Sequence, residues 1–210
     1  MTSRVLPRLY LVTNRHQTRD RPLPSVIQET LRAGTRFIQL REKDLETRQL
    51  ITLAQDIRVA SQEHQALMLI NDRVDIAKAI GADGVHLRTD SLPIQQTRQV
   101  LGPQALIGKS THSLREALTA EAEGADFLVC GPIFETPSKK TYGPPLGLTV
   151  LTDICKQSAL PIFAIGGMTP ERIQDVRDCG AYGVALISAI LESTTIPRAT
   201  QQFLHALETS

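Results

Sequence analysis

One stretch of the sequence places anion-binding side chains directly after a buried strand. The apolar run 127–130 ends at Gly131-Pro132, and hydroxyl and lysine side chains follow it: Thr136, Ser138, Lys139 and Lys140. A lysine supplies a mobile positive charge, and serine and threonine supply neutral hydrogen-bond donors. The pattern predicts an anion-binding loop at the end of a strand. A solvated loop with two ordinary surface lysines is the alternative.

Polar and charged side chains stand at the ends of four other apolar runs. The runs are 37–41, 67–70, 84–87 and 105–108, and the side chains within or after their ends are Gln39, Arg41, Glu42, Lys43, Asn71, Asp72, Arg88, Asp90, Lys109 and Ser110. An arginine can donate two parallel hydrogen bonds to phosphate oxygens, and a lysine acts as a point charge. The basic members therefore suit a small polyanion such as a pyrophosphate.

Two carboxylates, Asp72 and Asp90, follow neighbouring strands within this otherwise basic set. Mg²⁺ is usually held by one or two carboxylates together with phosphate oxygens of a substrate. We therefore predict Mg²⁺ as a cofactor, with Asp72 and Asp90 as its ligands. For each aspartate, the alternative role is to cap the helix that follows it.

A second anion site is indicated near the end of the chain. Gly166-Gly167 follows the apolar run 161–165, and Ser188 follows the run 183–187, which ends in Ile187. Adjacent glycines let the backbone approach a ligand closely, and backbone N–H groups at the start of a helix bind phosphate. The sequence thus predicts a monophosphate site separate from the pyrophosphate site.

Alternating strands and helices position all of these residues. Eight apolar strands are predicted, each followed by a helical segment, and they are 9–13, 37–41, 67–70, 84–87, 105–108, 127–130, 161–165 and 183–187. We predict the α/β class, as a single (β/α)8 TIM barrel with short loops that forms one domain over residues 1–210. A doubly wound sheet is the alternative, but no GxGxxG follows the first strand. In a barrel, the carboxyl ends of the strands meet at one mouth.

Composition excludes several other classes of protein. The net charge of +1 argues against a nucleic-acid-binding face, and no apolar run reaches membrane length. The 3 cysteines are odd in number and have no CxxC spacing, which favours a reducing, cytoplasmic environment over a disulfide framework. We expect small-molecule partners, and the oligomeric state stays open, a homo-oligomer included.

Motifs spread over nearly the whole chain resemble those of thiamine phosphate synthases and the related thiazole tautomerases. The matching segments are 9–13, 39–43, 71–75, 81–87, 131–139, 164–167 and 187–190. The resemblance implies a barrel enzyme, a transferase that joins hydroxymethylpyrimidine pyrophosphate to hydroxyethylthiazole phosphate. In that family, pyrophosphate leaves first, and the thiazole nitrogen then attacks the pyrimidine carbocation.

The resemblance also implies a role for each matching residue. The pyrophosphate contacts would be Gln39, Arg41, Lys43 and Asn71, and the Mg²⁺ ligand would be Asp72. The pyrimidine contacts would be Ser110 and Lys139, and the thiazole phosphate contacts would be Thr136, Ser138, Gly167, Ile187 and Ser188. We predict the catalytic residues to be Arg41, Lys43, Lys139 and Ser110. Two further residues are predicted to bind substrate: Glu42 and Gly166.

One stretch departs from the family pattern. The family usually has Gly-Gln-Glu-Asp where this chain has Arg88-Thr89-Asp90-Ser91, and the last Asp of the family is a second Mg²⁺ ligand. Counted without a gap, Ser91 takes that position, whereas a shift of one residue would place Asp90 there. Asn14 also stands where the family usually has Asp. The alternatives to a synthase are a tautomerase-like relative and a barrel that binds thiamine precursors without catalysis.

Overall fold

The computed structural model describes residues 5–136 and 144–210. Within these residues, eight parallel strands form a closed barrel in chain order, in which β1 pairs with both β2 and β8. The strands are β1 (Leu9–Val12), β2 (Phe37–Leu40), β3 (Leu67–Asn71), β4 (Gly84–Leu87), β5 (Leu106–Thr111), β6 (Phe127–Cys130), β7 (Ile162–Ile165) and β8 (Gly183–Leu186). The predicted (β/α)8 TIM barrel is confirmed.

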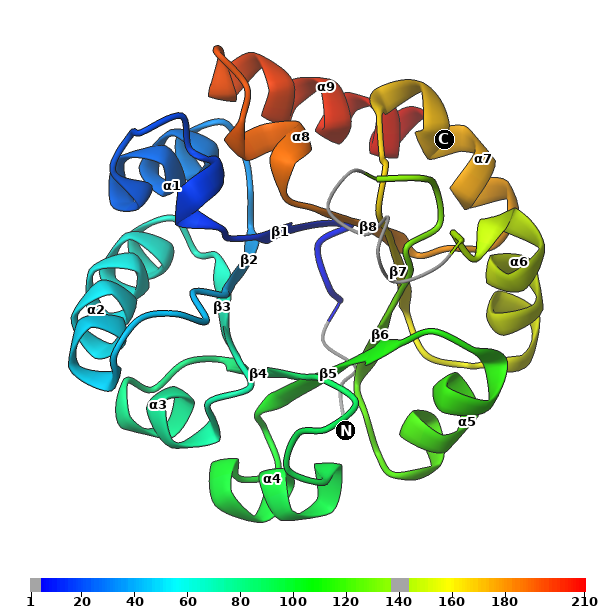
Figure 1. Ribbon diagram of the computed structural model, residues 1–210, viewed down its shortest axis with the longest axis horizontal. Helices are drawn as coiled ribbons and strands as arrows, with labels where there is room; N and C mark the ends of the chain where they lie inside the picture. Colours follow the sequence, from blue (N-terminus) through cyan, green and yellow to red (C-terminus); the bar gives the residue numbers. More distant parts are fainter. Residues whose placement is uncertain (1–4, 137–143) are drawn as a thin grey trace.

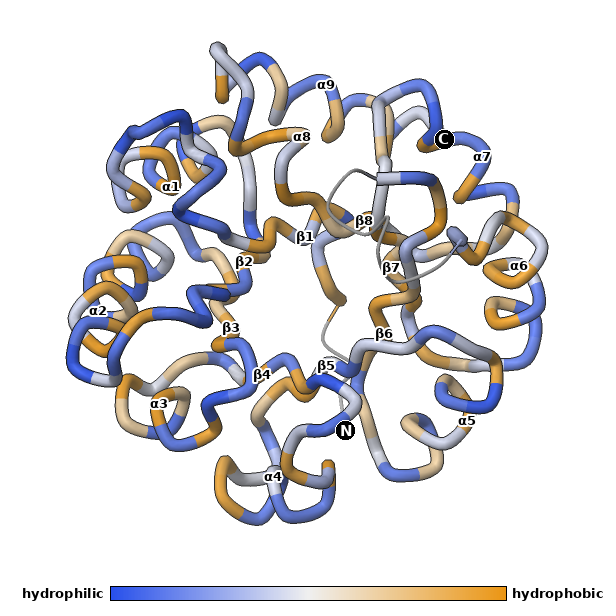
Figure 2. The backbone as a smooth tube through the Cα atoms, in the orientation of Figure 1, coloured by the Kyte–Doolittle hydropathy of each residue, from blue (hydrophilic) through white to orange (hydrophobic). Residues whose placement is uncertain are grey.

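Helices surround this ring of strands, as Figure 1 shows. They are α1 (Leu23–Arg32), α2 (Thr47–Glu63), α3 (Val74–Ala79), α4 (Ile94–Leu101), α5 (Leu114–Ala122), α6 (Gly147–Gln157), α7 (Ile173–Asp178), α8 (Ser188–Leu191) and α9 (Ile196–Thr209), with the 3-10 turns η1 (Arg15–Gln17) and η3 (Pro170–Arg172). Apolar and polar residues alternate around the helical turns (Figure 2), so one side of each helix can pack on the barrel. In the described ranges, every helix is too short or too polar to cross a bilayer.

Aromatic side chains fill the inside of the barrel. Tyr10 of β1 stacks on Phe37 of β2 with ring centroids 4.1 Å apart, and Phe127 and Phe163 pack against both rings. Side chains alternate between the two faces of a strand. Gln39, two residues after Phe37, is therefore buried in the same interior, one layer nearer to the carboxyl ends of the strands.

Two arginine–aspartate pairs stand at the opposite, amino-terminal end of the strands. Asp83 precedes β4 and accepts hydrogen bonds from Arg58 at 2.6 Å and from a backbone N–H of β3 at 2.9 Å. Asp126 precedes β6 and accepts from Arg98 at 2.8 Å and from a backbone N–H of β5 at 2.7 Å. Each carboxylate thereby joins a strand to a helix that covers it.

The structure differs from the predicted elements in a few places. Strand β5 continues to Thr111, so Lys109 and Ser110 lie within the strand and not after it. The short elements η1 and α8 were not predicted, because three or four residues show no periodicity. Ser113 caps α5, with its Oγ accepting from the N–H of Glu116 at 3.2 Å.

Candidate active site

Strand alternation brings predicted site residues from several strands into one mouth. His86 of β4 is buried inside the barrel, 5.9 Å from Tyr10 between ring centroids. Arg88 follows His86 by two residues, as Arg41 follows the buried Gln39. Since the strands of a closed parallel barrel end on one side, these side chains converge there.

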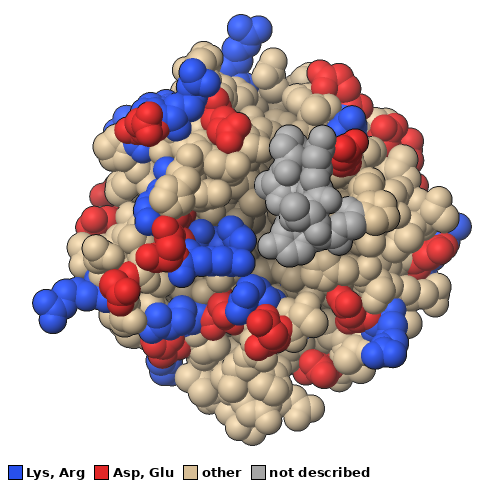
Figure 3. All heavy atoms as spheres, viewed as in Figure 1, with Lys and Arg blue, Asp and Glu red and all other residues tan. Residues whose placement is uncertain are grey.

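Three cations lie close together in this mouth. Burial lowers the pKa of the Arg41 guanidinium, Glu42 raises that pKa, and the nearby charge of Arg88 lowers it again. Lys109 Nζ donates a hydrogen bond to the backbone carbonyl of Arg88 at 2.7 Å. Figure 3 shows Lys and Arg side chains gathered beside the centre of the face, next to β2, β3 and β4. Such a concentration of positive charge attracts a small polyanion.

The Asp72 carboxylate lies between Arg88 and Ser91. Asp72 Oδ2 accepts from NH2 and Nε of Arg88 at 3.0 and 3.3 Å, and Asp72 Oδ1 accepts a short hydrogen bond from Ser91 Oγ. The backbone of Asp72 is left-handed, with φ of 62°, and its N–H donates to the His86 carbonyl. Asp is one of the few residue types that adopt this conformation readily. The Asp72 side chain thus links the segment after β3, to which it belongs, with the segment after β4.

The oxygen atoms beside Asp72 fit a Mg²⁺ ion that is completed by substrate phosphates. Asp72 and Ser91 place a carboxylate next to a hydroxyl, and Mg²⁺ prefers such hard oxygen ligands. The Asp90 carboxylate lies 3.4 Å from Arg88 NH2, and its side chain is 73% exposed. Residues 5–136 and 144–210 contain no group of three or more His, Cys, Asp or Glu that could hold a metal. The geometry thus favours Ser91 over Asp90 as the neighbour of Asp72.

His86 positions Ser110, one of the predicted catalytic residues. His86 Nε2 lies 2.9 Å from Ser110 Oγ. Burial lowers the pKa of His86 to about 3, and the charges of Arg41 and Lys109 lower it in the same direction. The imidazole is therefore neutral at neutral pH. A neutral ring can hydrogen-bond the hydroxyl without adding another positive charge to the mouth.

Glu42 organises the loops after β1 and β2. Its carboxylate is buried and accepts from Thr13 Oγ1 at 2.6 Å and from the N–H of Arg15 at 3.0 and 3.2 Å. Thr13 Oγ1 in turn accepts from the N–H of Arg41 at 2.8 Å. These contacts fit a role of Glu42 in positioning Arg41, and the predicted role of Glu42 in binding substrate stays a prediction.

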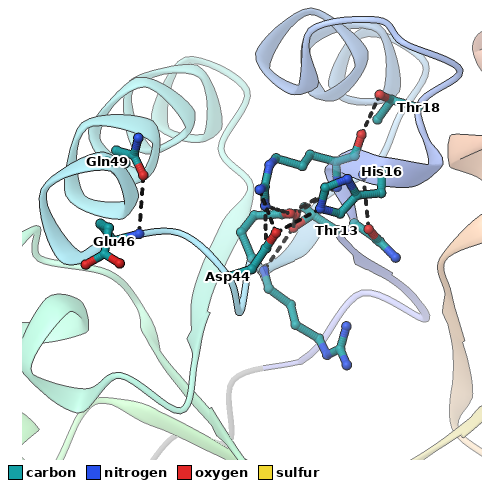
Figure 4. A network of polar contacts seen from close by, with 10 residues as sticks. Thr13, His16, Thr18, Asp44, Glu46 and Gln49 are labelled. Atoms are coloured by element: carbon teal, nitrogen blue, oxygen red, sulfur yellow. Dashed lines mark hydrogen bonds and ion pairs between the residues drawn. The ribbon is translucent and has the colours of Figure 1, made fainter.

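A second carboxylate, Asp44, ties the same two loops together at the surface (Figure 4). Arg15 donates to both Asp44 oxygens at 2.5 and 2.7 Å, and His16 Nε2 lies 2.9 Å from Asp44 Oδ2. Hydrogen bonds from Arg15 and, to a smaller extent, from His16 hold the pKa of Asp44 far below its usual range. Sequence reasoning missed this network, because about thirty residues separate its members and no motif joins them.

The glycines after β7 permit close packing of two loops. Gly166 and Gly167 have φ of 99° and 64°. A Cβ on Gly167 would lie 2.7 Å from the Glu135 carbonyl oxygen and 2.8 Å from Phe134 Cβ. Arg172 stacks over the Phe134 ring at 4.5 Å and donates to the Gly167 carbonyl. Only glycine fits at Gly167 without a shift of the loop after β6.

The other predicted site residues are also at the carboxyl ends of their strands. Asn71 is the last residue of β3, and Ile187 and Ser188 join β8 to α8. Lys43 is exposed in the loop after β2, and Thr136 is half-buried beyond β6. Three residues of the predicted anion-binding loop lie outside the described ranges: Ser138, Lys139 and Lys140.

The barrel and its cationic mouth define an α/β-barrel enzyme that acts on small phosphorylated molecules. The family model described as thiamine monophosphate synthase matches residues 9–190. The chain therefore belongs to the thiamine monophosphate synthase family, as its motifs predicted.

Individual relatives agree with this assignment. The chain is 46% identical over 199 residues to a Geobacter sulfurreducens protein provisionally named thiamine-phosphate synthase, covering 95% of this chain and 93% of that protein. It is 37% identical to the thiamine-phosphate synthase of Clostridium novyi, covering 92% and 95% of the two chains. The solved structure of thiamine phosphate pyrophosphorylase from Pyrococcus furiosus superposes with a TM-score of 0.88 at 34% identity, covering 96% of each chain.

Proposed function

We propose that this chain is a thiamine phosphate synthase, a transferase that joins hydroxymethylpyrimidine pyrophosphate to hydroxyethylthiazole phosphate. The observation that carries the proposal is the mouth itself, where Arg41, Arg88 and Lys109 lie close together and Arg88 pairs with Asp72, in a barrel of this family. In the reaction, the bond between the pyrimidine methylene carbon and the pyrophosphate oxygen breaks. A bond from the thiazole nitrogen to that carbon then forms, and pyrophosphate is released.

In this proposal, the half of the mouth formed by β2 to β5 holds the pyrophosphate. Gln39, Arg41, Lys43 and Asn71 contact its oxygens, and Ser110 contacts the pyrimidine. Negative charge grows on the leaving group as its bond breaks, so fixed cations stabilise the transition state more than the ground state. We assign this stabilisation of the leaving pyrophosphate to Arg41, Lys43 and Lys139. Ser110 would orient the pyrimidine ring.

Mg²⁺ is part of the proposal. Asp72 would hold the ion with Ser91 beside it, and the ion would supply positive charge to the departing pyrophosphate. The Asp90 carboxylate lies 3.4 Å from Arg88 NH2. Asp90 could therefore become a second carboxylate ligand of the ion only if the loop after β4 moves.

The other half of the mouth, formed by β6 to β8, would hold the thiazole phosphate. Thr136 and Ser138 would supply hydroxyl donors, and Gly166, Gly167 and Ser188 would supply backbone N–H groups, with Ile187 against the thiazole. Backbone N–H groups bind a phosphate without adding charge. The thiazole nitrogen would thereby face the pyrimidine carbon from the side opposite the leaving group.

The decisive experiment incubates the protein with both substrates and Mg²⁺ and follows pyrophosphate and thiamine phosphate. We expect both products in equal amounts. Isomerised thiazole alone would support a tautomerase, and binding without any product would support a non-catalytic barrel. Since the 3 cysteines are all free, we also infer a cytoplasmic enzyme with small-molecule partners.

A further inference from the structure

Arg88 presents its guanidinium to the barrel mouth from a fixed backbone. Its N–H donates to Ser91 Oγ at 2.7 Å, and its carbonyl accepts from Lys109 Nζ at 2.7 Å. The two contacts come from the loop after β4 and from β5. A side chain held at its base in this way loses less conformational entropy when it binds a ligand.

The contacts of the guanidinium leave part of it available to a ligand. Nε and NH2 donate to Asp72 at 3.3 and 3.0 Å, and NH2 lies 3.4 Å from Asp90. Within residues 5–136 and 144–210, NH1 has no hydrogen-bond acceptor. The side chain is 39% exposed, so these N–H donors can reach a molecule in the mouth.

A second guanidinium lies nearby. The charge of Arg88 lowers the pKa of Arg41, so the two groups repel each other across the mouth. A dianion or trianion that contacts both groups would remove this repulsion and satisfy their donors. Two planar guanidinium groups can donate in parallel to the oxygens of two linked phosphates.

We infer that Arg88 is a further pyrophosphate-binding residue, which adds a second guanidinium to that of Arg41. The inference rests on the proposed function, since it names an additional contact of the same site. The competing explanation is that Arg88 only neutralises Asp72 and contacts no phosphate.

The test measures binding of inorganic pyrophosphate by isothermal titration calorimetry in the presence of EDTA. We compare the wild-type protein with Arg88→Gln, which keeps a polar side chain, although a shorter one, and removes the charge. Loss of a charge-assisted contact should weaken binding roughly tenfold. Arg73→Gln is the matched control, because Arg73 is also an arginine bonded to an aspartate, Asp75, at the start of α3. It should change the dissociation constant less than twofold.

A second pair of variants separates phosphate binding from neutralisation of Asp72. In Asp72→Asn, Arg88 no longer has a charged partner there, so Arg88→Gln should still weaken pyrophosphate binding roughly tenfold in that background. If Arg88 only neutralises Asp72, Arg88→Gln alone should weaken binding but have no effect once Asp72 is Asn. That result, or equal binding by Arg88→Gln and the wild type, would overturn the inference.

The same titrations separate this inference from the proposed function. Wild-type protein that binds no pyrophosphate in EDTA would overturn the role of Arg88, because two guanidinium groups should hold the anion without a metal. The synthase assay would still decide the proposed function independently. Circular dichroism melts of every variant establish that each one is folded.

Discussion

Each end of the barrel contains an ion pair between an arginine and an aspartate, but the two pairs lie in different surroundings. At the amino-terminal end, Arg58 and Asp83 have side chains only 17% and 15% exposed, and Asp83 also accepts a backbone N–H of β3. At the carboxyl-terminal mouth, Arg88 and Asp72 are 39% and 27% exposed, and Asp72 accepts the Ser91 hydroxyl. The first pair joins elements of the fold to one another, whereas the second faces the space where substrate would bind.

This difference follows from how a parallel barrel is built. The amino-terminal pair saturates its carboxylate with protein donors and lies away from the mouth, so it contributes mainly to stability. The mouth pair is more open to water, which weakens its contribution to stability. It also keeps N–H donors for a ligand. An arginine–aspartate pair therefore indicates function through its location and accessibility, and the residue types alone do not distinguish the two.

The largest effect is expected for Asp72→Asn in the mouth. Loss of the charge should lower kcat by a hundredfold or more, on the order seen when one group that stabilises a charged transition state is removed. The free energy of unfolding should change by less than about 1 kcal/mol, since the ion pair is partly exposed and Asn also accepts a left-handed backbone. Steady-state kinetics and urea unfolding measure the two quantities. A large loss of stability with little loss of activity would contradict the distinction between the two ends.

The same substitution at the other end, Asp83→Asn, should give the opposite result. It leaves Arg58 in a largely buried position without its charged partner, which should cost about 2–3 kcal/mol in the free energy of unfolding. kcat should stay within about twofold of the wild-type value, because Asp83 lies at the far end of the strands. If kcat falls strongly while the protein stays folded at the assay temperature, the amino-terminal pair also influences the mouth.

His86 lies in the barrel interior below the mouth. We expect its lowered pKa to make the free energy of unfolding depend on pH. Its pKa is about 3 in the folded protein, below the value of 6.5 for a free imidazole, so the unfolded chain binds the proton more readily. Stability should therefore fall as the pH falls from 6.5 toward 3, by about 1.4 kcal/mol for each pH unit. Urea unfolding between pH 7.5 and 5 should show this slope in the wild type and a smaller slope in His86→Gln. His205→Gln, in the exposed part of α9, is the control and should keep the wild-type slope.

Two glycines with nearly equal backbone angles offer a smaller test of the same comparison. Gly167 at the mouth has φ of 64° and would place a Cβ against Glu135, whereas Gly81 between α3 and β4 has φ of 61° and open space around it. Alanine at either position should cost roughly 1–2 kcal/mol of stability from the backbone angle. Only Gly167→Ala should also raise KM for the thiazole phosphate, by roughly tenfold, because it displaces the loop after β6. Equal KM values in the two variants would separate Gly167 from the phosphate site.

The strands and the charged mouth could be predicted from sequence because each depends on local pattern. Apolar runs of four or five residues define the strands, and the residues that follow each run, such as Asn71 and Asp72, must lie at the mouth of a barrel. The hydrogen bonds of Glu42 could not be predicted, because its partners Thr13 and Arg15 are far away in the sequence. A charged residue after a strand looks the same whether it turns toward substrate or toward a neighbouring loop.

In the loop after β4, the sequence likewise did not determine which single residue lies beside Asp72. The loop sequence, Arg88-Thr89-Asp90-Ser91, allowed either Asp90 or Ser91 to take the position of the family's second metal ligand. Only the turn geometry shows that Ser91 is the residue beside Asp72. The N–H of Arg88 donates to Ser91 Oγ, which folds the loop back so that Ser91 meets Asp72. Secondary-structure reasoning does not specify a turn of this kind.

The smallest expected effect tests that placement of Ser91. Ser91→Ala removes the hydroxyl beside Asp72 and the acceptor for the Arg88 N–H, so the Mg²⁺ concentration for half-maximal activity should rise roughly threefold to tenfold. Asp90→Asn should change it less than twofold, because the Asp90 carboxylate is 73% exposed and contacts Arg88 at 3.4 Å. Electron paramagnetic resonance of bound Mn²⁺ provides a readout that does not depend on turnover, and it should show the same order. If Asp90→Asn weakens Mn²⁺ binding and Ser91→Ala does not, then Asp90 moves onto the metal when it binds. The loop after β4 would then have two arrangements, and the contact between Ser91 and Asp72 would belong to only one of them.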